Sequence, residues 1–215
     1  MNILVLAAHP DDETLGCGGT LKKFSEDRDN DVAVITFTDG GSARPGGRGR
    51  CDDLQDASNL LGFRVLSSFR YPDNELDSVP QLRLNKSVES ILERTQFQPD
   101  MIITHNPWCL NIDHKRVFEV SQVIGRSYKC KHMCFEVPSS SEWNFTSDFR
   151  ANCYVELNKD QVDAKMKTLY SCYIDEMRPT PHPRSVENLV SALRVNGSVV
   201  GVEYAEKFMS IKEVL

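Results

Sequence analysis

An apolar segment that leads straight into a cluster of charged residues constrains this chain more than any other feature. Residues 2–8 are almost entirely apolar, and the run His9-Pro10-Asp11-Asp12-Glu13 follows them directly. A short continuous apolar run is typical of a strand buried on both faces, as in a parallel sheet. In open sheets of this kind, sites form where the strands end. The run 9–13 is therefore predicted to lie at such an edge.

The same alternation of apolar strand and helix continues along the chain. Alternating strands and helices favour a parallel sheet that helices cover on both faces. We therefore predict an α/β fold of the Rossmann-like, three-layer αβα type with a mostly parallel sheet, formed by a single domain over residues 1–215. Strands are predicted at 2–8, 32–38, 65–69 and 100–104, and helices at about 14–29, 52–61, 80–95, 114–127, 159–171 and 184–196.

Composition excludes several classes of protein. The 25 basic and 31 acidic residues give a net charge of −6, so no broad basic field predicts a nucleic-acid partner. No apolar run approaches the ~18 residues that a membrane-spanning helix needs, and the first strand begins at once, which leaves no room for a signal peptide. Seven cysteines without a C-x-x-C pair indicate reduced thiols rather than a disulfide framework. We expect a cytoplasmic protein.

The charged run after the first strand predicts a metal site. Pro10 biases His9 towards an extended backbone, so His9 should end the strand pointing into the crevice. Asp11 and Asp12 are neighbours and cannot point the same way. We expect His9 and Asp12 to converge on one divalent ion, while Asp11 stays off it and takes a proton from the attacking water. In the alternative interpretation, the carboxylates merely favour the start of the next helix.

A third metal ligand is predicted from a second junction of strand and helix. The predicted strand 100–104 is followed by a loop over 105–111, after which Asp113 and His114 open the next helix. The carboxyl ends of parallel strands share one edge of a sheet, so the two junctions can meet. A lone histidine at a helix start is commonly a capping or surface residue. Together with His9 and Asp12, however, His114 completes a ligand set suited to zinc.

At these two junctions the chain resembles the LmbE/PIG-L family of zinc-dependent N-deacetylases. Ala8 to Glu13 match the family's A-H-P-D-D-E signature in full. The second signature, H-x-D-H, is matched at Asp113 and His114, but Asn111 replaces its leading histidine. Further blocks that resemble the family are Thr38-Asp39-Gly40-Gly41, Arg50 with Asp53, Tyr71-Pro72-Asp73-Asn74, Glu136-Val137-Pro138-Ser139-Ser140, Pro181-His182-Pro183-Arg184-Ser185 and Glu203 to Phe208.

The resemblance implies a zinc-dependent hydrolase that removes the N-acetyl group of an amino sugar or its conjugate, a small-molecule substrate of the N-acetylglucosamine type. Zn²⁺ would be held by His9, Asp12 and His114, with Asp11 as general base. Glu13 and Asp113 would orient ligands or catalytic imidazoles.

The histidine missing at Asn111 must be replaced by another donor for the developing oxyanion. We predict that His182, held between two prolines, supplies it, with Asp113 orienting its imidazole. The alternative is that His182 is a surface histidine in a proline-rich loop.

Four further questions stay open from the sequence. A binding protein that keeps the metal pocket without turnover is favoured by Asn111 and disfavoured by the intact Asp11. A hydrolase of another bond, such as a phosphoester, would commonly use two ions. The segment 40–50, with three arginines and five glycines, fits either a surface loop or a substrate lid. The oligomeric state is not predicted, and a homo-oligomer is compatible with the sequence.

Overall fold

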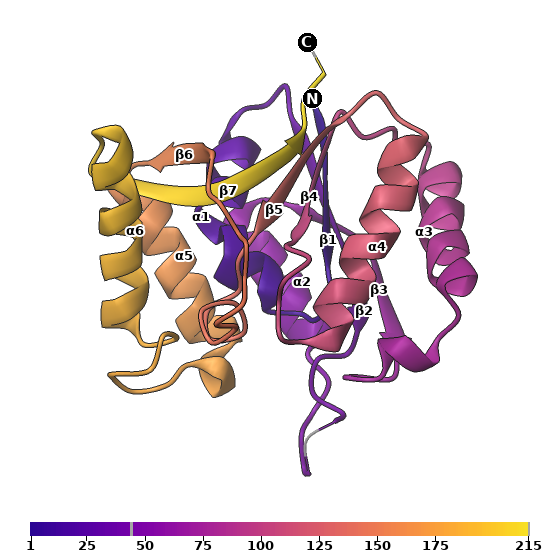
Figure 1. Cartoon of the computed structure of the whole chain (residues 1–215), viewed down its shortest axis with the longest axis horizontal. Coiled ribbons are helices and arrows are strands. Elements are labelled where there is room, and N and C mark those ends of the chain that lie inside the picture. The colour runs from indigo at the N-terminus through magenta and orange to yellow at the C-terminus, as the bar shows by residue number, and fades with distance from the viewer. Residues whose placement is uncertain (44, 215) are drawn as a thin grey trace.

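The computed structural model describes residues 1–43 and 45–214, and in it the chain folds into a sheet of seven strands covered by helices (Figure 1). Arg44, in the segment 40–50, lies outside the described residues. The strands are β1 (Asn2–Ala7), β2 (Asp31–Thr38), β3 (Arg64–Tyr71), β4 (Met101–His105), β5 (Lys131–Phe135), β6 (Cys153–Leu157) and β7 (Tyr204–Lys212). The helices are α1 (Asp12–Glu26), α2 (Cys51–Leu61), α3 (Gln81–Thr95), α4 (Ile112–Arg126), α5 (Lys159–Cys172) and α6 (Val186–Val200), with 3₁₀ turns η1 (Leu76–Ser78) and η2 (Ile174–Glu176).

The sheet is mostly parallel, as the alternating pattern predicts. Its order is β3-β2-β1-β4-β5-β7-β6, and the pairs among the first five strands are parallel. β7 runs antiparallel to both β5 and β6, so only the C-terminal edge departs from the parallel pattern. The predicted α/β fold is confirmed.

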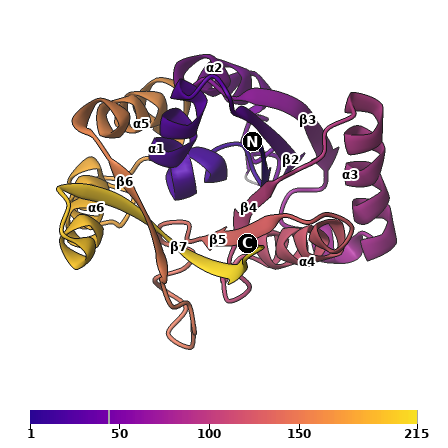
Figure 2. The ribbon, with the colours of Figure 1, turned by 90° about the horizontal axis from the view of Figure 1, so that it is seen from above.

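Helices lie on both faces of the sheet because β1 buries side chains on both. One face of β1 packs with apolar residues of α1, α2 and α5, and the other packs with those of α3 and α4. Figure 2 shows these two layers on opposite sides of the strands. Ile3, Leu4, Val5 and Leu6 are each 0% exposed, which explains why the strand is an unbroken apolar run rather than an alternating one.

The order of the strands creates a switch point between β1 and β4. β1 pairs with β2 on one side and with β4 on the other, so the chain connections leave the middle of the sheet in opposite directions. In open α/β sheets, ligands bind in the crevice outside the carboxyl ends of the strands at such a point. His9 lies just beyond the end of β1 and His105 is the last residue of β4, so both histidines lie at this crevice.

No helix among the described residues is long and apolar enough to cross a membrane.

Candidate active site

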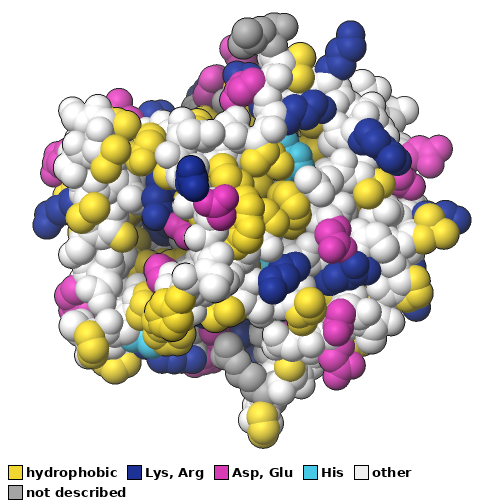
Figure 3. Space-filling view, viewed as in Figure 1, with side chains coloured by type: hydrophobic (Ala, Val, Ile, Leu, Met, Phe, Trp, Pro, Cys, Tyr) yellow, Lys and Arg dark blue, Asp and Glu magenta, His cyan; other side chains and the backbone are white. Residues whose placement is uncertain are grey.

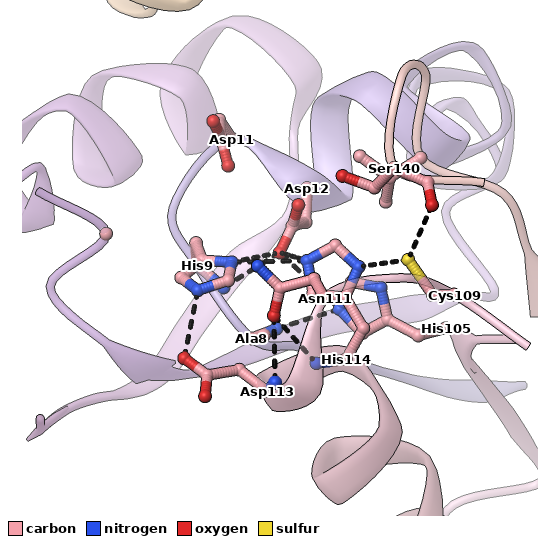
Figure 4. A network of polar contacts seen from close by, with 12 residues as sticks. Ala8, His9, Asp11, Asp12, His105, Cys109, Asn111, Asp113, His114 and Ser140 are labelled. Carbon is pink, nitrogen blue, oxygen red and sulfur yellow. Dashed lines mark hydrogen bonds and ion pairs between the residues drawn. The ribbon is translucent and has the colours of Figure 1, made fainter. Parts of the chain in front are cut away.

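Two imidazoles and one carboxylate meet at the ends of β1 and β4 (Figure 4). Nδ1 of His9 lies 2.9 Å from Oδ2 of Asp12. Nε2 of His114 lies 3.3 Å from the same oxygen and 3.3 Å from Nδ1 of His9. All three residues are buried. We call His9, Asp12 and His114 the metal group.

Two further carboxylates support the imidazole of His9 on its other side. Nε2 of His9 lies 3.1 Å from Asp73 and 3.1 Å from Asp113. Asp113 is itself held, because its two oxygens accept the backbone N–H groups of Asn74 and Leu76 at 2.7 and 2.9 Å. A carboxylate that accepts Nε2–H turns Nδ1 towards a metal and fixes the orientation of the ring.

His114 is supported by a thiol instead. Its Nδ1 lies 3.0 Å from Sγ of Cys109, whose S–H donates to the backbone oxygen of Ser140 at 3.5 Å. The imidazole of His105 stacks on the His114 ring, with centroids 3.9 Å apart, and accepts the backbone N–H of Ala8. These contacts fix the His114 ring with Nε2 facing His9 and Asp12.

The charges around the metal group favour a cation between its members. Burial by itself lowers the pKa of His114, but the adjacent Asp12 carboxylate and the Cys109 thiol raise it to about 9. Burial likewise opposes protonation of His9, yet Asp12, Asp113 and Asp73 hold its pKa well above the usual value. The imidazoles of His114, His9 and His105 in turn hold the pKa of Asp12 well below its usual value, against the effect of burial.

This donor set fits a zinc ion. Zinc in hydrolytic sites takes about three ligands from imidazole nitrogens and carboxylate oxygens and leaves one position open. The metal group offers two imidazole nitrogens and one carboxylate oxygen within 4.8 Å of one another. Each imidazole has a hydrogen-bond partner on its far nitrogen, an arrangement found in most histidine metal sites.

Asp11 lies beside the metal group without joining it (Figure 4). Its φ of 139° places it in a region that residues other than glycine rarely adopt, at a cost of order 1–3 kcal/mol. Glu13 holds this conformation, because its Oε2 accepts the backbone N–H of Asp11 at 3.0 Å while Oε1 accepts the hydroxyl of Tyr173. The side chain of Asp11 makes no capping bond to α1. Asp11 therefore does not cap the helix, whereas Asp12 and Glu13 lie in its first turn, where their charges favour the helix start.

A chain of ion pairs holds the carboxylate of Asp11. Arg50 donates from Nη1 to Asp11 at 3.1 Å and from Nη2 to Glu176 at 2.6 Å. Arg184 donates from Nη1 to the other oxygen of Glu176 at 2.8 Å and lies 3.8 Å from Asp11. Burial and the Asp12 charge raise the pKa of Asp11 to about 7, although both arginines oppose the shift. We call Arg50, Glu176 and Arg184 the arginine group.

The metal group and the arginine group line one small polar pocket. Its volume is about 60 Å³, far below the ≈300 Å³ at which ligand pockets usually begin. Such a space accepts a few waters or one small acyl group. The pocket is lined by His9, Asp11, Asp12, Gly40, Arg50, Asp73, Asn74, Asn111, His114, Ser140, Glu176 and Arg184.

The structure brings together five of the six residues predicted as metal ligands or catalytic groups. His182 is the exception, because it neither lines the pocket nor contacts His9 as Asp113 does. Its Nδ1 accepts the backbone N–H of Arg184 at 3.0 Å, and its ring meets that of Trp143. Asp113 contacts His9 rather than the imidazole of His182 that we expected it to orient.

Asn111 takes a structural part at the position where the resemblance predicts a histidine. Its Oδ1 accepts the backbone N–H groups of Asp113 and His114 at 2.8 and 3.4 Å, so it caps the N-terminus of α4. Its Nδ2 donates to Asn74. Asn111 therefore helps to place His114.

Several residues of the site were not predicted individually. Asp73 and Arg184 lie in blocks that resemble the family, so the pattern marked their segments without giving their roles. Arg50 lies in another such block. Cys109 and Glu176 had no sequence signal, because the contacts that each makes depend on loops that meet only in the folded chain.

Comparison with known proteins agrees with this geometry. A family model described as GlcNAc-PI de-N-acetylase (PIG-L) matches residues 4–124, more than half of the chain. The diacetylchitobiose deacetylase of Thermococcus kodakarensis is 25% identical over 114 residues, which are 49% of this chain and 41% of that enzyme. The match thus spans less than half the length of this relative.

Solved structures share the fold at low sequence identity. The N,N′-diacetylchitobiose deacetylase from Pyrococcus horikoshii has a TM-score of 0.74 at 22% identity, over 98% of this chain and 83% of that chain. The 4-carboxy-2-hydroxymuconate hydratase from Pseudomonas putida KT2440 has a TM-score of 0.72 at 18% identity, over 100% and 97%. Proteins named for different reactions share this fold, so the reaction must be argued from the site.

The family match covers both junctions that build the metal group, from His9 to His114, together with the helices and strands between them. The resemblance found in the two short motifs is thereby confirmed. This chain belongs to the GlcNAc-PI de-N-acetylase (PIG-L) family.

Proposed function

We propose that the chain is a metal-dependent amide hydrolase that removes the N-acetyl group from an amino sugar or its conjugate. One observation carries the proposal: a buried carboxylate, Asp11, stands beside the metal group and outside it, in a pocket whose volume of about 60 Å³ matches one small acyl group. A base that stands next to an electrophilic centre without binding to it is the arrangement that hydrolysis requires. Membership of the deacetylase family supports the choice of an acetamide.

His9, Asp12 and His114 would hold the metal, and zinc is the ion that their chemistry favours. When bound, zinc supplies Lewis acidity, which polarises the acyl carbonyl and makes a water more acidic. The protein keeps the three ligands in place with Asp73, Asp113 and Cys109 on the far sides of the imidazoles.

Asp11 would act as general base and then as general acid. Its carboxylate takes a proton from the attacking water and returns it to the departing amine of the sugar. The pKa of about 7, set by burial and Asp12, allows both protonation states near neutral pH. Arg50 holds the carboxylate in place through its bond to Oδ2, and Glu176 balances the charge of Arg50.

Arg184 would provide the hydrogen-bond donor to the oxyanion, in place of the missing histidine. Its guanidinium lies on the pocket wall, 3.8 Å from Asp11, and is anchored by Glu176 and by the backbone oxygen of Pro138. A fixed cation beside the reacting carbonyl stabilises the oxyanion as it forms. The geometry favours Arg184 over His182, because His182 does not reach the pocket wall.

The contacts around His9 argue against a two-ion phosphoesterase. His9, Asp73 and Asp113 also form a group of three donor atoms that a second ion would need. Both oxygens of Asp113, however, accept backbone N–H groups, and Oδ2 of Asp73 accepts the backbone N–H of Ala43. These carboxylates therefore support His9 by hydrogen bonding. A binding protein without turnover would not need Asp11 held in a strained conformation.

The test is release of acetate from a panel of N-acetylated sugars, nucleotide sugars and glycosides, with zinc-loaded protein and the Asp11→Asn variant as control. We expect equimolar acetate and free amine from at least one substrate, and at least 10²-fold less from the variant. Acetate release that is equal in both proteins, or absent across the panel, would overturn the proposal.

A further inference from the structure

The pocket is too small for the sugar that carries the acyl group. A volume of about 60 Å³ accepts the acetyl group and leaves a pyranose ring outside. The sugar, and whatever is attached to it, must then rest on the residues around the mouth. The loops that form this rim are therefore the candidates for a substrate-binding surface.

Two of these loops are joined beside the pocket. Ser140 and Arg184 both line the pocket, one from the loop between β5 and β6 and the other from the loop before α6. Arg184 donates from Nε to the backbone oxygen of Pro138 at 3.1 Å. A few residues further along each loop, the rings of Trp143 and His182 meet at 5.2 Å and 80°.

Trp143 is placed where the packing of the core does not require it. The residue is 49% exposed, although tryptophan is usually highly buried. The other tryptophan, Trp108, packs beside the small apolar cluster of Phe118, Cys134 and Met209. In Figure 3 a histidine lies beside apolar side chains at the lower left, on the side where the loop before α6 runs in Figure 1.

His182 connects this aromatic surface to the pocket. It accepts the backbone N–H of Arg184 through Nδ1, so its ring is held two residues from a side chain of the pocket wall. The indole contacts the His182 ring nearly at a right angle, and the residue stays half-exposed. A half-exposed indole that packs on His182, on the same loop as Ser140 of the pocket wall, offers a large amphipathic contact area at low entropic cost.

We propose that Trp143, held by His182, forms a saccharide subsite that binds the ring or aglycone attached beyond the acetylated sugar. The inference rests on the proposed deacetylase function and adds the part of the substrate that lies outside the pocket. The apolar C–H face of a pyranose packs on the indole, and its hydroxyl groups stay in water. Longer N-acetylated glycoconjugates are thus preferred over the free monosaccharide, and the preference is carried by binding.

Steady-state acetate release from N-acetylglucosamine and from N,N′-diacetylchitobiose tests this subsite. Trp143→Ala should lower the ratio of kcat/KM for the disaccharide over that for the monosaccharide by about tenfold, through KM, which is the scale of one aromatic contact. Phe145→Ala is the matched control, because Phe145 lies in the same loop and is 93% exposed. It should change the ratio less than about twofold. Equal ratios in wild type and Trp143→Ala, or an equal loss in both variants, would overturn the subsite.

A binding measurement separates this inference from the proposed function. In a Trp108→Phe/Asp11→Asn protein, Trp143 is the one tryptophan left, since the chain has two. Its fluorescence should respond to the disaccharide at about tenfold lower concentration than to the monosaccharide. That response without acetate release from wild type would overturn the deacetylase and keep the subsite. Acetate release without the response would overturn the subsite and keep the deacetylase.

Discussion

The metal group and the arginine group share one pocket but are built differently. His9 and Asp12 follow the end of β1, and His114 lies in the first turn of α4, the helix that follows β4, so all three lie at the edge that the parallel strands share. Arg50 lies at the start of α2, and Glu176 and Arg184 come from the segment between α5 and α6. The first group is fixed by the sheet, and the second is fixed by ion pairs among its own members.

This difference separates holding a metal from guiding a proton. The metal group is backed by carboxylates and a thiol that leave its inner atoms facing one point. The arginine group contacts the run at 9–13 at the carboxylate of Asp11 and at the backbone oxygen of Pro10. If the two groups work in this way, substitutions in the metal group should change metal content. Substitutions in the arginine group should change the rate at constant metal content.

The largest effect is expected at Asp11, which stands between the two groups. Asp11→Asn should keep the zinc, because Asp11 lies outside the metal group, while kcat falls by roughly 10²- to 10⁴-fold. Elemental analysis and acetate release measure the two quantities on one preparation. Parallel loss of zinc and rate would make Asp11 a ligand, and a normal rate would remove it from the mechanism.

A smaller loss of rate is expected from the arginine group. Arg184→Met should lower kcat by roughly 10²-fold, the scale for one oxyanion donor, with zinc content unchanged. Arg184→Lys keeps the charge without the planar fork and should recover part of the rate. Thermal unfolding of each variant checks that losing the ion pair between Arg184 and Glu176 does not destabilise the fold. If both variants retain near-normal kcat, Arg184 does not stabilise the oxyanion, and Arg50 becomes the candidate.

The smallest effect is expected behind the metal group. Cys109→Val removes the hydrogen-bond partner of His114 while keeping a similar volume, and should weaken zinc binding by roughly 10- to 100-fold. Cys109→Ser retains a donor and acceptor and should lose less. Competition with a chromogenic chelator gives the affinity without any assay of activity. Unchanged affinity in Cys109→Val would show that stacking on His105 suffices to hold the imidazole.

The sequence predicts the metal group better than the arginine group for a physical reason. His9 to Glu13 are contiguous, and the periodicity of the chain already places them and His114 at strand ends. Glu176 contributes through two arginines that lie 126 and 8 residues away in the chain, which no local pattern encodes. The sequence predicts His182 as the oxyanion donor, because a missing histidine suggests replacement by another imidazole, whereas we propose Arg184, two residues on, from the contacts of the folded chain.

Boundaries near the site show the same limit. The first helix was predicted to start at about residue 14, but α1 begins at Asp12, so Asp12 lies in its first turn. The unusual φ of Asp11 depends on Glu13, which accepts the backbone N–H of Asp11. Glu13 is held in turn by the hydroxyl of Tyr173, at the C-terminal end of α5. Such a conformation follows from tertiary contacts rather than from local propensity.

Zinc titration of chelator-treated protein tests the central claim most directly. If His9, Asp12 and His114 hold one catalytic ion, acetate release should rise with added zinc and saturate at about one ion per chain. His114→Ala, which leaves two ligands, should bind little zinc and release almost no acetate over the same range. Full activity after chelation, saturation only at two ions, or full zinc occupancy in His114→Ala would contradict the account.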